Sequence, residues 1–431
     1  MLTSAMDVNR ARVPREVLVH LEAAECEWEL APHRTVRGWG YNGRVPGPVI
    51  EASVADTLVV HLTNRLPEPT TIHWHGLRLP APMDGTRDSR LPVQPGEAFE
   101  YRFVLPDAGT FWYHSHFNET VQVERGLYGA LVVRGDDEPS LDRDRVLVLD
   151  DLKLRRRGRS APTGRMLERH NEREGSVRLV NGLAEPELVI SAGHVERWRI
   201  VNAASARYVR LSLGGRTFRI IGSDGGLLEA PIEATEVLLA PSDRVEIVVG
   251  PFVAGETIAV ESLPYDRGMG LNDVERFATL RVGPAASSVG MVPDHLRKIE
   301  PLVDSAVLPT RTVRLGGRMN LVRGVDFLVN GERHHHDGAV TVGSLEVWDI
   351  VNETAVDHPF HLHGFFFQVL DVNGVAPAVL SWEDTVNVPR KSRVRIAWHV
   401  DDRPGRWMYH CHIPEHHAGG MMAHFDVVAG P

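Results

Sequence analysis

The chain repeats one unit three times, and this repeat constrains the possible fold more than any other feature of the sequence. Each copy opens with an Asn-Gly pair, and a second asparagine follows 21 or 22 residues later, directly after a strand-like run. The Asn-Gly pairs lie at residues 42–43, 181–182 and 330–331, so successive units begin 139 and 149 residues apart. This spacing fits one β domain per unit.

The composition of each unit favours β structure. Short runs rich in valine, isoleucine and leucine, such as residues 57–62, alternate with turns rich in glycine, proline and asparagine. Long amphipathic helical periods are scarce. The pattern predicts antiparallel β-sandwiches or barrels. We predict three domains, over residues 1–137, 138–290 and 291–431.

Charge and hydropathy exclude several classes of partner. The formal net charge is −10, so we expect neither a nucleic-acid partner nor binding to anionic lipid. No apolar run is long enough to span a bilayer. The opening residues, Met1–Asp7, carry neither a basic nor an apolar segment and do not form a signal peptide as given. We expect a periplasmic or secreted mature form, with a cytoplasmic protein as the alternative.

Four histidine motifs carry the chemical signal, two in the first unit and two in the third. Strand geometry places both imidazoles of a His-x-His pair on one face, which suits a cluster of several metal ions. At the matching place the middle unit, residues 202–207, has no histidine, so we predict that it is a spacer that binds none of these metal ions. The histidines of these pairs are His73, His75, His114, His116, His361, His363, His410 and His412.

Cys411 lies between His410 and His412, so in a strand its side chain points away from theirs. The tripeptide could therefore join a mononuclear site to the cluster behind it. One thiolate, two imidazoles and a weak axial thioether form the blue-copper pattern, whereas zinc favours more thiolates or a single four-ligand group, and calcium favours carboxylates. The residues that supply the copper pattern are Cys411, His358, His416 and Met421.

In type, order and spacing, these motifs resemble the four copper signatures of the multicopper oxidases, and more narrowly of bacterial three-domain laccases. The resemblance covers nearly the whole chain. It implies three consecutive cupredoxin-like Greek-key β-barrel or sandwich domains and four copper ions per chain. It also implies the ligands: for type 1 copper, His358, Cys411 and His416 with Met421 axial; for type 2, His73 and His361; for the type 3 pair, His75, His114, His116, His363, His410 and His412.

The same resemblance implies an activity. A small aromatic reductant, a phenol or an aromatic amine, would give single electrons to type 1 copper near His416, and Cys411 would pass them on for the reduction of dioxygen to two waters. A metallo-oxidase of Cu(I), Fe(II) or Mn(II) is the alternative; the single Met269 in its Gly-rich loop argues mildly against Cu(I). A non-catalytic copper electron-transfer protein is disfavoured, because all ten histidine ligands and the cysteine ligand are present. The oligomeric state is not predicted.

Acidic residues near the motifs suggest how protons are supplied. Asp84 matches the acidic position that the family uses near the dioxygen site, so we predict a catalytic proton role for it. A second family acid often follows the type 1 histidine directly, but here that position is His417. The second proton route could therefore use His417, water or another acid. Asp384 is a candidate for orienting a ligand histidine.

Overall fold

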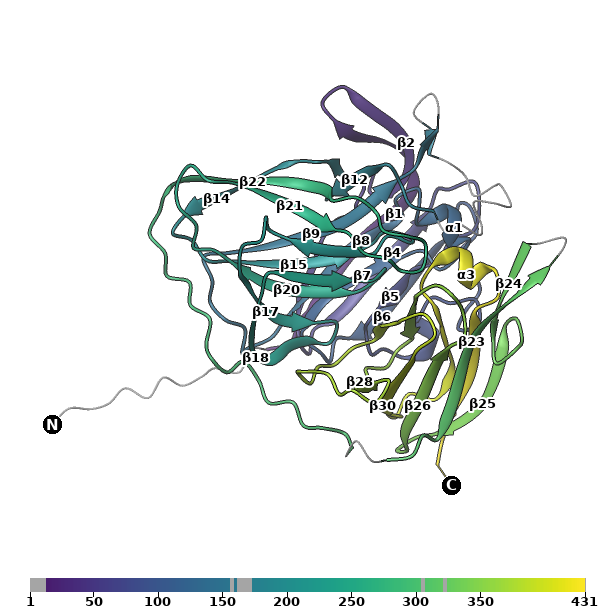
Figure 1. Ribbon diagram of the computed structural model, residues 1–431. Helices are drawn as coiled ribbons and strands as arrows, with labels where there is room; N and C mark the ends of the chain where they lie inside the picture. Colours follow the sequence, from purple (N-terminus) through teal and green to yellow (C-terminus); the bar gives the residue numbers. More distant parts are fainter. Residues whose placement is uncertain (1–12, 156–158, 161–172, 304–306, 321–323, 431) are drawn as a thin grey trace.

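The computed structural model describes residues 13–155, 159–160, 173–303, 307–320 and 324–430. Met1–Asp7 therefore lies outside the described residues. The described elements are almost all strands, arranged as three pairs of sheets (Figure 1). The prediction of an all-β protein is confirmed. The boundaries near residues 137 and 290 stay predictions.

The first unit combines a six-stranded sheet, β10-β11-β2-β1-β4-β6, with a four-stranded sheet, β3-β8-β7-β5. A 3-10 helix, η1 (Ala81–Met83), and a short helix, α1 (Glu119–Gln122), lie between its strands. The strands are β1 (Glu16–Ala31), β2 (Arg34–Tyr41), β3 (Ile50–Ser53), β4 (Thr57–Asn64), β5 (His73–His75), β6 (Ala98–Val104), β7 (Gly109–His114), β8 (Tyr128–Arg134), β10 (Leu154–Arg155) and β11 (Arg159–Ser160).

The middle unit combines a seven-stranded sheet, β13-β12-β9-β15-β20-β17-β18, with a five-stranded sheet, β14-β22-β21-β16-β19. The strands are β9 (Arg143–Leu152), β12 (Val177–Val180), β13 (Leu183–Ala184), β14 (Glu187–Ala192), β15 (Glu196–Asn202), β16 (Val209–Ser212), β17 (Phe218–Ser223), β18 (Gly226–Ala234), β19 (Glu236–Leu239), β20 (Arg244–Val249), β21 (Thr257–Leu263) and β22 (Glu275–Ala285).

The third unit combines two five-stranded sheets, β24-β23-β26-β30-β28 and β25-β32-β31-β27-β29. A short helix, α3 (Pro414–Ala418), follows β31. The strands are β23 (Arg311–Asn320), β24 (Gly324–Val329), β25 (His335–Thr341), β26 (Leu345–Asn352), β27 (His358–Leu362), β28 (Gln368–Val372), β29 (Thr385–Val388), β30 (Arg393–His399), β31 (Gly405–Cys411) and β32 (Met422–Val428).

The sheets are mixed rather than purely antiparallel, which corrects one expectation. In each unit the first long strand runs parallel to a later strand of its own sheet: β1 with β4, β9 with β15, and β23 with β26. Parallel neighbours need a crossover connection. Here the crossover passes through a strand of the opposite sheet, namely β3, β14 or β25, so the connection itself ties the two sheets of each unit together.

The asparagine repeat has a structural cause. Each Asn-Gly pair forms a turn with positive φ at both residues, which these two residue types tolerate best. Each second asparagine is buried, and its side-chain amide donates to a backbone carbonyl of the loop that follows the strand. These second asparagines are Asn64, Asn202 and Asn352.

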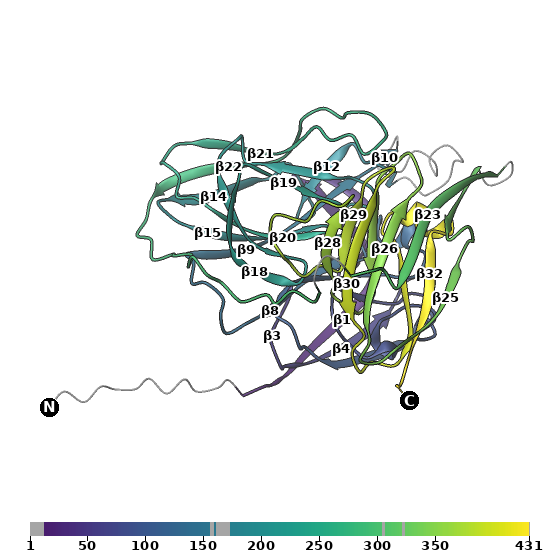
Figure 2. The same ribbon diagram turned by 60° about the horizontal axis from the view of Figure 1, so that its bottom comes forward.

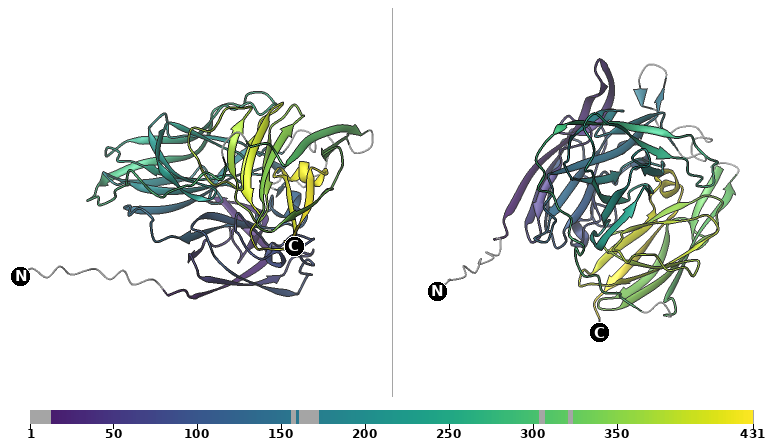
Figure 3. Two further views of the ribbon diagram at one scale, coloured as in Figure 1. Left: turned by 90° about the horizontal axis from the view of Figure 1, so that it is seen from below. Right: turned by 60° about the vertical axis from the view of Figure 1, so that its left-hand side comes forward.

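The units form a triangle in which each contacts the other two (Figures 2 and 3). One hydrophobic core cluster runs through both the first and the third unit, and the middle unit has a core cluster of its own. Helices α1 and α3 lie side by side where the outer units meet (Figure 1). Among the described residues, no helix has the length and apolar character needed to cross a bilayer.

Candidate metal centres

The thiol of Cys411 lies in a small buried group with two imidazoles. Its Sγ is 3.4 Å from Nδ1 of His358 and 3.4 Å from Nδ1 of His416, and the two Nδ1 atoms are 3.0 Å apart. Each residue comes from a different element, namely β27, β31 and α3. We call this the Cys411 group. Three donor atoms this close to one another in a buried space can hold one metal ion.

The surroundings fix both imidazoles of the Cys411 group. Nε2 of His358 lies 2.8 Å from the hydroxyl of Thr354, so Nδ1 is left facing the thiol. The ring of Phe327 stacks on that of His416 with centroids 4.0 Å apart. Burial lowers the pKa of both imidazoles well below the usual value and raises the pKa of the Cys411 thiol. The thiol therefore keeps its proton unless a cation displaces it.

Met421 lies beside this group and is fully buried. Its N–H donates to the carbonyl of His416 at 3.0 Å, and its own carbonyl accepts from the N–H of Cys411 at 3.1 Å. The backbone thus ties Met421 to two members of the Cys411 group.

Eight histidines gather on the other side of the Cys411 strand, in what we call the histidine cluster. The paired strands β5 and β7 of the first unit and β27 and β31 of the third unit, with the residues just after β7, β27 and β31, carry them to one place. The rings of His75 and His361 stack at 3.8 Å, and those of His73 and His363 lie 4.0 Å apart. All eight are buried: His73, His75, His114, His116, His361, His363, His410 and His412.

The orientation of these rings fits metal binding. In seven of the eight rings, one nitrogen lies within 3.0 Å of an oxygen atom, which in most cases is a backbone carbonyl. For example, His410 Nδ1 lies 2.9 Å from the carbonyl oxygen of Cys411. The Nε2 atoms of His363 and His410 face each other at 2.9 Å. Six further buried nitrogens have no hydrogen-bond partner among the described residues: Nε2 of His73, His114, His116, His361 and His412, and Nδ1 of His75.

Buried nitrogens without partners are costly in a folded protein. Burial lowers the pKa of six cluster imidazoles, which keeps them neutral and leaves a lone pair on each inward nitrogen. Metal ions would satisfy these atoms. An all-imidazole cluster beside a thiolate and two imidazoles is a donor set that suits copper, whereas Mg²⁺ and Ca²⁺ prefer oxygen ligands.

Asp84 lies against the histidine cluster, directly after η1, and is 2% exposed. Its Oδ2 is 3.0 Å from Nδ1 of His363, and its carbonyl oxygen is 3.0 Å from Nδ1 of His73. One acidic residue of the first unit thus contacts a histidine of each outer unit. The adjacent Gly85 has φ +81°, and a Cβ there would lie 1.8 Å from the carbonyl oxygen of Ile72, so only glycine lets the loop approach this closely.

Asp384 also contacts the cluster. Its Oδ1 lies 3.0 Å from Nε2 of His75 and 3.3 Å from Nδ1 of His361. Burial works to raise the pKa of Asp384, but the guanidinium of Arg244 holds it well below its usual range. Asp384 is therefore a carboxylate that orients one histidine of each outer unit.

Glu119 of α1 was missed by the sequence reasoning. Its Oε1 is 2.9 Å from Nδ1 of His116, and its Oε2 is 3.1 Å from Nδ1 of His417. Burial acts to raise the pKa of Glu119, but these two imidazoles hold it well below its usual range. The ring of His417 also stacks on that of His410 at 4.4 Å. The spacing of three residues from His116 was the one local signal for Glu119.

Together, the three-unit β fold, the thiolate group and the histidine cluster define a copper oxidoreductase. Comparison with known proteins gives the family. Three parts of the chain, residues 22–138, 150–251 and 311–431, match the multicopper oxidases, and the chain belongs to this family. Its cofactor is therefore copper, in sites of types 1, 2 and 3, and four ions per chain are standard for the family.

Several relatives match over most of their length. The chain is 31% identical to multicopper oxidase MmcO of Mycobacterium tuberculosis, across 90% of this chain and 82% of that protein. It is 30% identical to a laccase of Bacillus subtilis, across 94% and 93%. Among solved structures, a multicopper oxidase from Campylobacter jejuni described as a metallo-oxidase superposes with a TM-score of 0.86 at 30% identity, across 98% and 93% of the two chains.

Proposed function

We propose that this protein is a laccase-type oxidase that takes single electrons from phenols or aromatic amines and uses dioxygen as the acceptor. The observation that carries the proposal is the junction at Cys411. Its Sγ belongs to one centre, while the adjacent His410 and His412 belong to the other. One strand therefore links a one-ion site to a several-ion cluster, as an oxidase needs and a simple electron carrier does not.

We assign the copper ligands as follows. Type 1 copper is held by His358, Cys411 and His416, with Met421 as the axial ligand. Type 2 copper is held by His73 and His361. The type 3 pair is held by His75, His114, His116, His363, His410 and His412. The three buried donor atoms of the Cys411 group support the one-ion site, and the inward nitrogens of the histidine cluster support a site for several ions. The division of the cluster into types 2 and 3 rests on the resemblance to the family.

Bound copper would supply the redox chemistry, accepting single electrons at type 1 and reducing dioxygen to two waters at the three-ion cluster. The chain supplies orientation and protons. Asp84 Oδ2 lies 3.0 Å from His363 Nδ1, where it can hold a proton beside the cluster. Glu119 and His417 form a second hydrogen-bonded pair. This pair is a candidate for the second proton route, which the sequence alone did not assign. They border a cavity of about 490 Å³ that also reaches His116 and gives water a place near the cluster.

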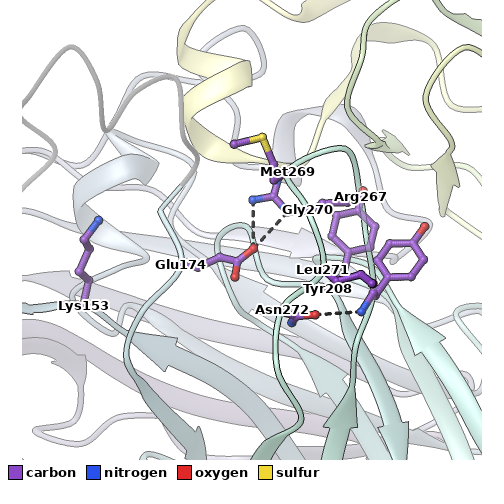
Figure 4. Close-up of a pocket in the computed structure, with 9 residues that line it drawn as sticks. Lys153, Glu174, Tyr208, Arg267, Met269, Gly270, Leu271 and Asn272 are labelled. Atoms are coloured by element: carbon purple, nitrogen blue, oxygen red, sulfur yellow. Dashed lines mark hydrogen bonds and ion pairs between the residues drawn. The ribbon is translucent and has the colours of Figure 1, made fainter.

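A second cavity, of about 330 Å³, suits the organic reductant (Figure 4). Tyr208 and Tyr265 line it with stacked rings, centroids 5.4 Å apart. The hydroxyl of Tyr265 donates to Asp357 at 2.6 Å, and Asp357 directly precedes His358 of the Cys411 group. Arg267, which also lines this cavity, lies close enough to His416 that its charge helps to lower the pKa of that imidazole, after the larger effect of burial. An aromatic molecule in this cavity would stack near the type 1 site.

A metallo-oxidase of Cu(I), Fe(II) or Mn(II) is the second candidate, because the Campylobacter jejuni structure is described as one. In the described part of the chain, Met269 is the one methionine that lines the cavity, and Glu174 is its one carboxylate. Glu174 is paired with Arg267 at 3.0 Å. A single thioether and a paired carboxylate offer a metal-ion substrate few ligands, so the cavity favours the aromatic reductant.

Oxygen consumption with a panel of reductants tests the proposal. The panel is a phenol, an aromatic amine, Cu(I), Fe(II) and Mn(II), each with the copper-loaded wild type and Met269→Ala, which changes a side chain 45% exposed. We expect turnover with the organic reductants in both proteins. Turnover with metal ions alone, or Cu(I) turnover lost in Met269→Ala, would favour the metallo-oxidase. Copper loading without turnover of any donor would favour the electron-transfer protein.

We also propose that the mature protein works in the periplasm or outside the cell, where small aromatic reductants and dioxygen are both available. Fractionation of the native host, followed by detection of the blue protein, tests this. Recovery in the cytoplasmic fraction alone would contradict it.

A further inference from the structure

Arg244 of β20 lies at the point where all three units meet. Its side chain is 0% exposed. It pairs with both carboxylate oxygens of Asp384 in the third unit, with Nη1 2.8 Å from Oδ1 and Nη2 on Oδ2. Its Nε donates to the carbonyl of Thr110 in the first unit at 3.2 Å. Within the middle unit, Nη2 donates to the carbonyl of Asp224 at 3.1 Å.

The carboxylate that Arg244 grips is the one that contacts the histidine cluster. Asp384 Oδ1 lies 3.0 Å from His75 Nε2 and 3.3 Å from His361 Nδ1. These two rings come from different units and stack at 3.8 Å. A two-point guanidinium–carboxylate pair fixes the plane of the carboxylate as well as its position. The plane of Asp384, in turn, sets the direction of both imidazoles.

The first unit leaves room for this pair. Gly76 directly follows His75, and a Cβ at that position would lie 2.5 Å from Arg244 Nη2 and 2.6 Å from Asp384 Oδ2. The residue after a cluster histidine thus has no side chain because the guanidinium occupies that space. A second contact of the middle unit supports the same rings: Ser242 Oγ lies 3.3 Å from Thr385 Oγ1, which is 3.2 Å from His361 Nδ1.

We propose that Arg244 is a positioning residue for the histidine cluster. Through Asp384 it holds His75 and His361 in their binding orientation. The middle unit thus acts on the cluster although none of its described histidines belongs to it. The inference rests on the proposed copper assignment, in which His75 and His361 bind type 3 and type 2 copper. The middle unit is then more than a spacer. Loss of Arg244 would leave the Asp384 carboxylate buried without its cation, free to turn away from the imidazoles or to take up a proton.

The test compares Arg244→Met and Arg244→Lys with a matched control, Arg199→Met. Arg199 is also 0% exposed, lies on the neighbouring strand β15, and pairs with Glu246 at 2.6 Å and with Thr110 Oγ1 at 3.2 Å. Among the described residues its guanidinium bonds to Asp144, Thr110, Glu246 and Glu138, none of which is a cluster histidine. Each copper-loaded protein is measured for copper per chain, blue absorption, the type 2 electron paramagnetic resonance signal and thermal unfolding.

We expect Arg244→Met to keep its blue absorption but to hold type 2 copper about 10- to 100-fold more weakly, as for other partners that orient metal ligands. Arg244→Lys should recover part of the loss, and Arg199→Met should lose thermal stability while keeping the type 2 signal. An unchanged type 2 signal in Arg244→Met, or an equal loss of it in Arg199→Met, would overturn the inference.

Asp384→Asn covers the case in which Arg244→Met does not fold. It removes the charge that Arg244 neutralises and replaces one carboxylate oxygen by an amide, so we expect the same selective loss of type 2 copper; an unchanged type 2 signal would overturn the inference. Failure of the proposed function would be distinct: the wild type itself would then lack blue absorption or the cluster copper.

Discussion

The first and third units place the same elements around two different polar groups. In the third unit, His358, Cys411 and His416 bring two imidazoles and a thiol together. In the first unit, Ser115 takes the place of Cys411 between two cluster histidines, and Thr70 stands three residues before a cluster histidine, as His358 does. The two units therefore share one arrangement of strands but differ in the buried polar side chains at matching positions.

The interior of the first unit is satisfied by hydrogen bonds alone. Ser115 Oγ donates to Gln122 Oε1 at 2.6 Å, and Thr70 Oγ1 donates to the same oxygen at 2.7 Å. All three side chains are fully buried. The hydroxyls and the amide need no ion, whereas the Cys411 group of the third unit brings three metal-donor atoms together. In the proposed assignment, a few residues therefore separate a unit that helps hold the cluster from one that can also pass electrons to it.

The largest expected effect comes from Cys411→Ser, which gives the third unit the residue of the first. The blue absorption should disappear and turnover should fall to background, because the type 1 site loses its thiolate. Absorption spectra and oxygen consumption measure this. Ser115→Ala, at the matching position of the first unit, is the control and should keep both. Turnover retained in Cys411→Ser would break the comparison.

Asp84→Asn should have the next largest effect. Asp84 belongs to the first unit but contacts His363 of the third, so it tests whether the first unit serves the cluster rather than the type 1 site. We expect oxygen reduction to slow about 10- to 100-fold. Anaerobic bleaching of the blue colour by a reductant should keep its rate, and stopped-flow absorption separates the two steps. Equal slowing of both would exclude the proton role.

Glu124→Gln should alter how the free energy of unfolding depends on pH. Glu124 lies near Arg173, which also pairs with Glu415 of α3, so this variant tests the contact between the outer units. Burial raises the pKa of Glu124 to about 8, despite the nearby Arg173. Between the ordinary value of 4.5 and about 8, the folded protein keeps a proton that the unfolded chain has lost. The free energy of unfolding should therefore fall as pH rises through this window, by up to about 1.4 kcal/mol per pH unit from this group. Glu124→Gln should flatten that slope in denaturant titrations; an unchanged slope would contradict the assignment.

Ser115→Cys should have the smallest effect. It gives the first unit the thiol of the third without the two imidazoles, since Thr70 and Gln122 remain in place. We expect no second blue absorption and a loss of about 1–3 kcal/mol in the free energy of unfolding, from the weakened hydrogen bond to buried Gln122. A second blue site in this variant would contradict this expectation, because it would show that a thiolate without the two imidazoles is enough to form a type 1 site in the first unit.

The sequence predicted the β fold, and it predicted which side chains lie together in the Cys411 group and in the histidine cluster, because both depend on local patterns. The period of two in His-x-His and the odd offset of His358 already decide which side chains share a face. The three-fold repeat predicted which units carry them. The prediction of purely antiparallel sheets was wrong, because pairing such as β1 with β4 depends on how crossovers pass between sheets and leaves no local pattern.

The sequence could not predict the residues that act across unit boundaries. Arg244 opens an ordinary strand run, and its partner Asp384 is 140 residues away. Glu119 reaches His417 across 298 residues. Nothing in either local sequence says that these charges become buried together. Only the packing of three units around one cluster makes them partners.

The most direct test of the difference between the two outer units is copper per chain in the wild type and in Cys411→Ser. We predict four ions in the wild type, as is standard for the family, and three in the variant, because only the type 1 site depends on the thiolate while the eight histidines remain. An unchanged copper content, or loss of all copper in the variant, would contradict the account of two separate centres joined at Cys411.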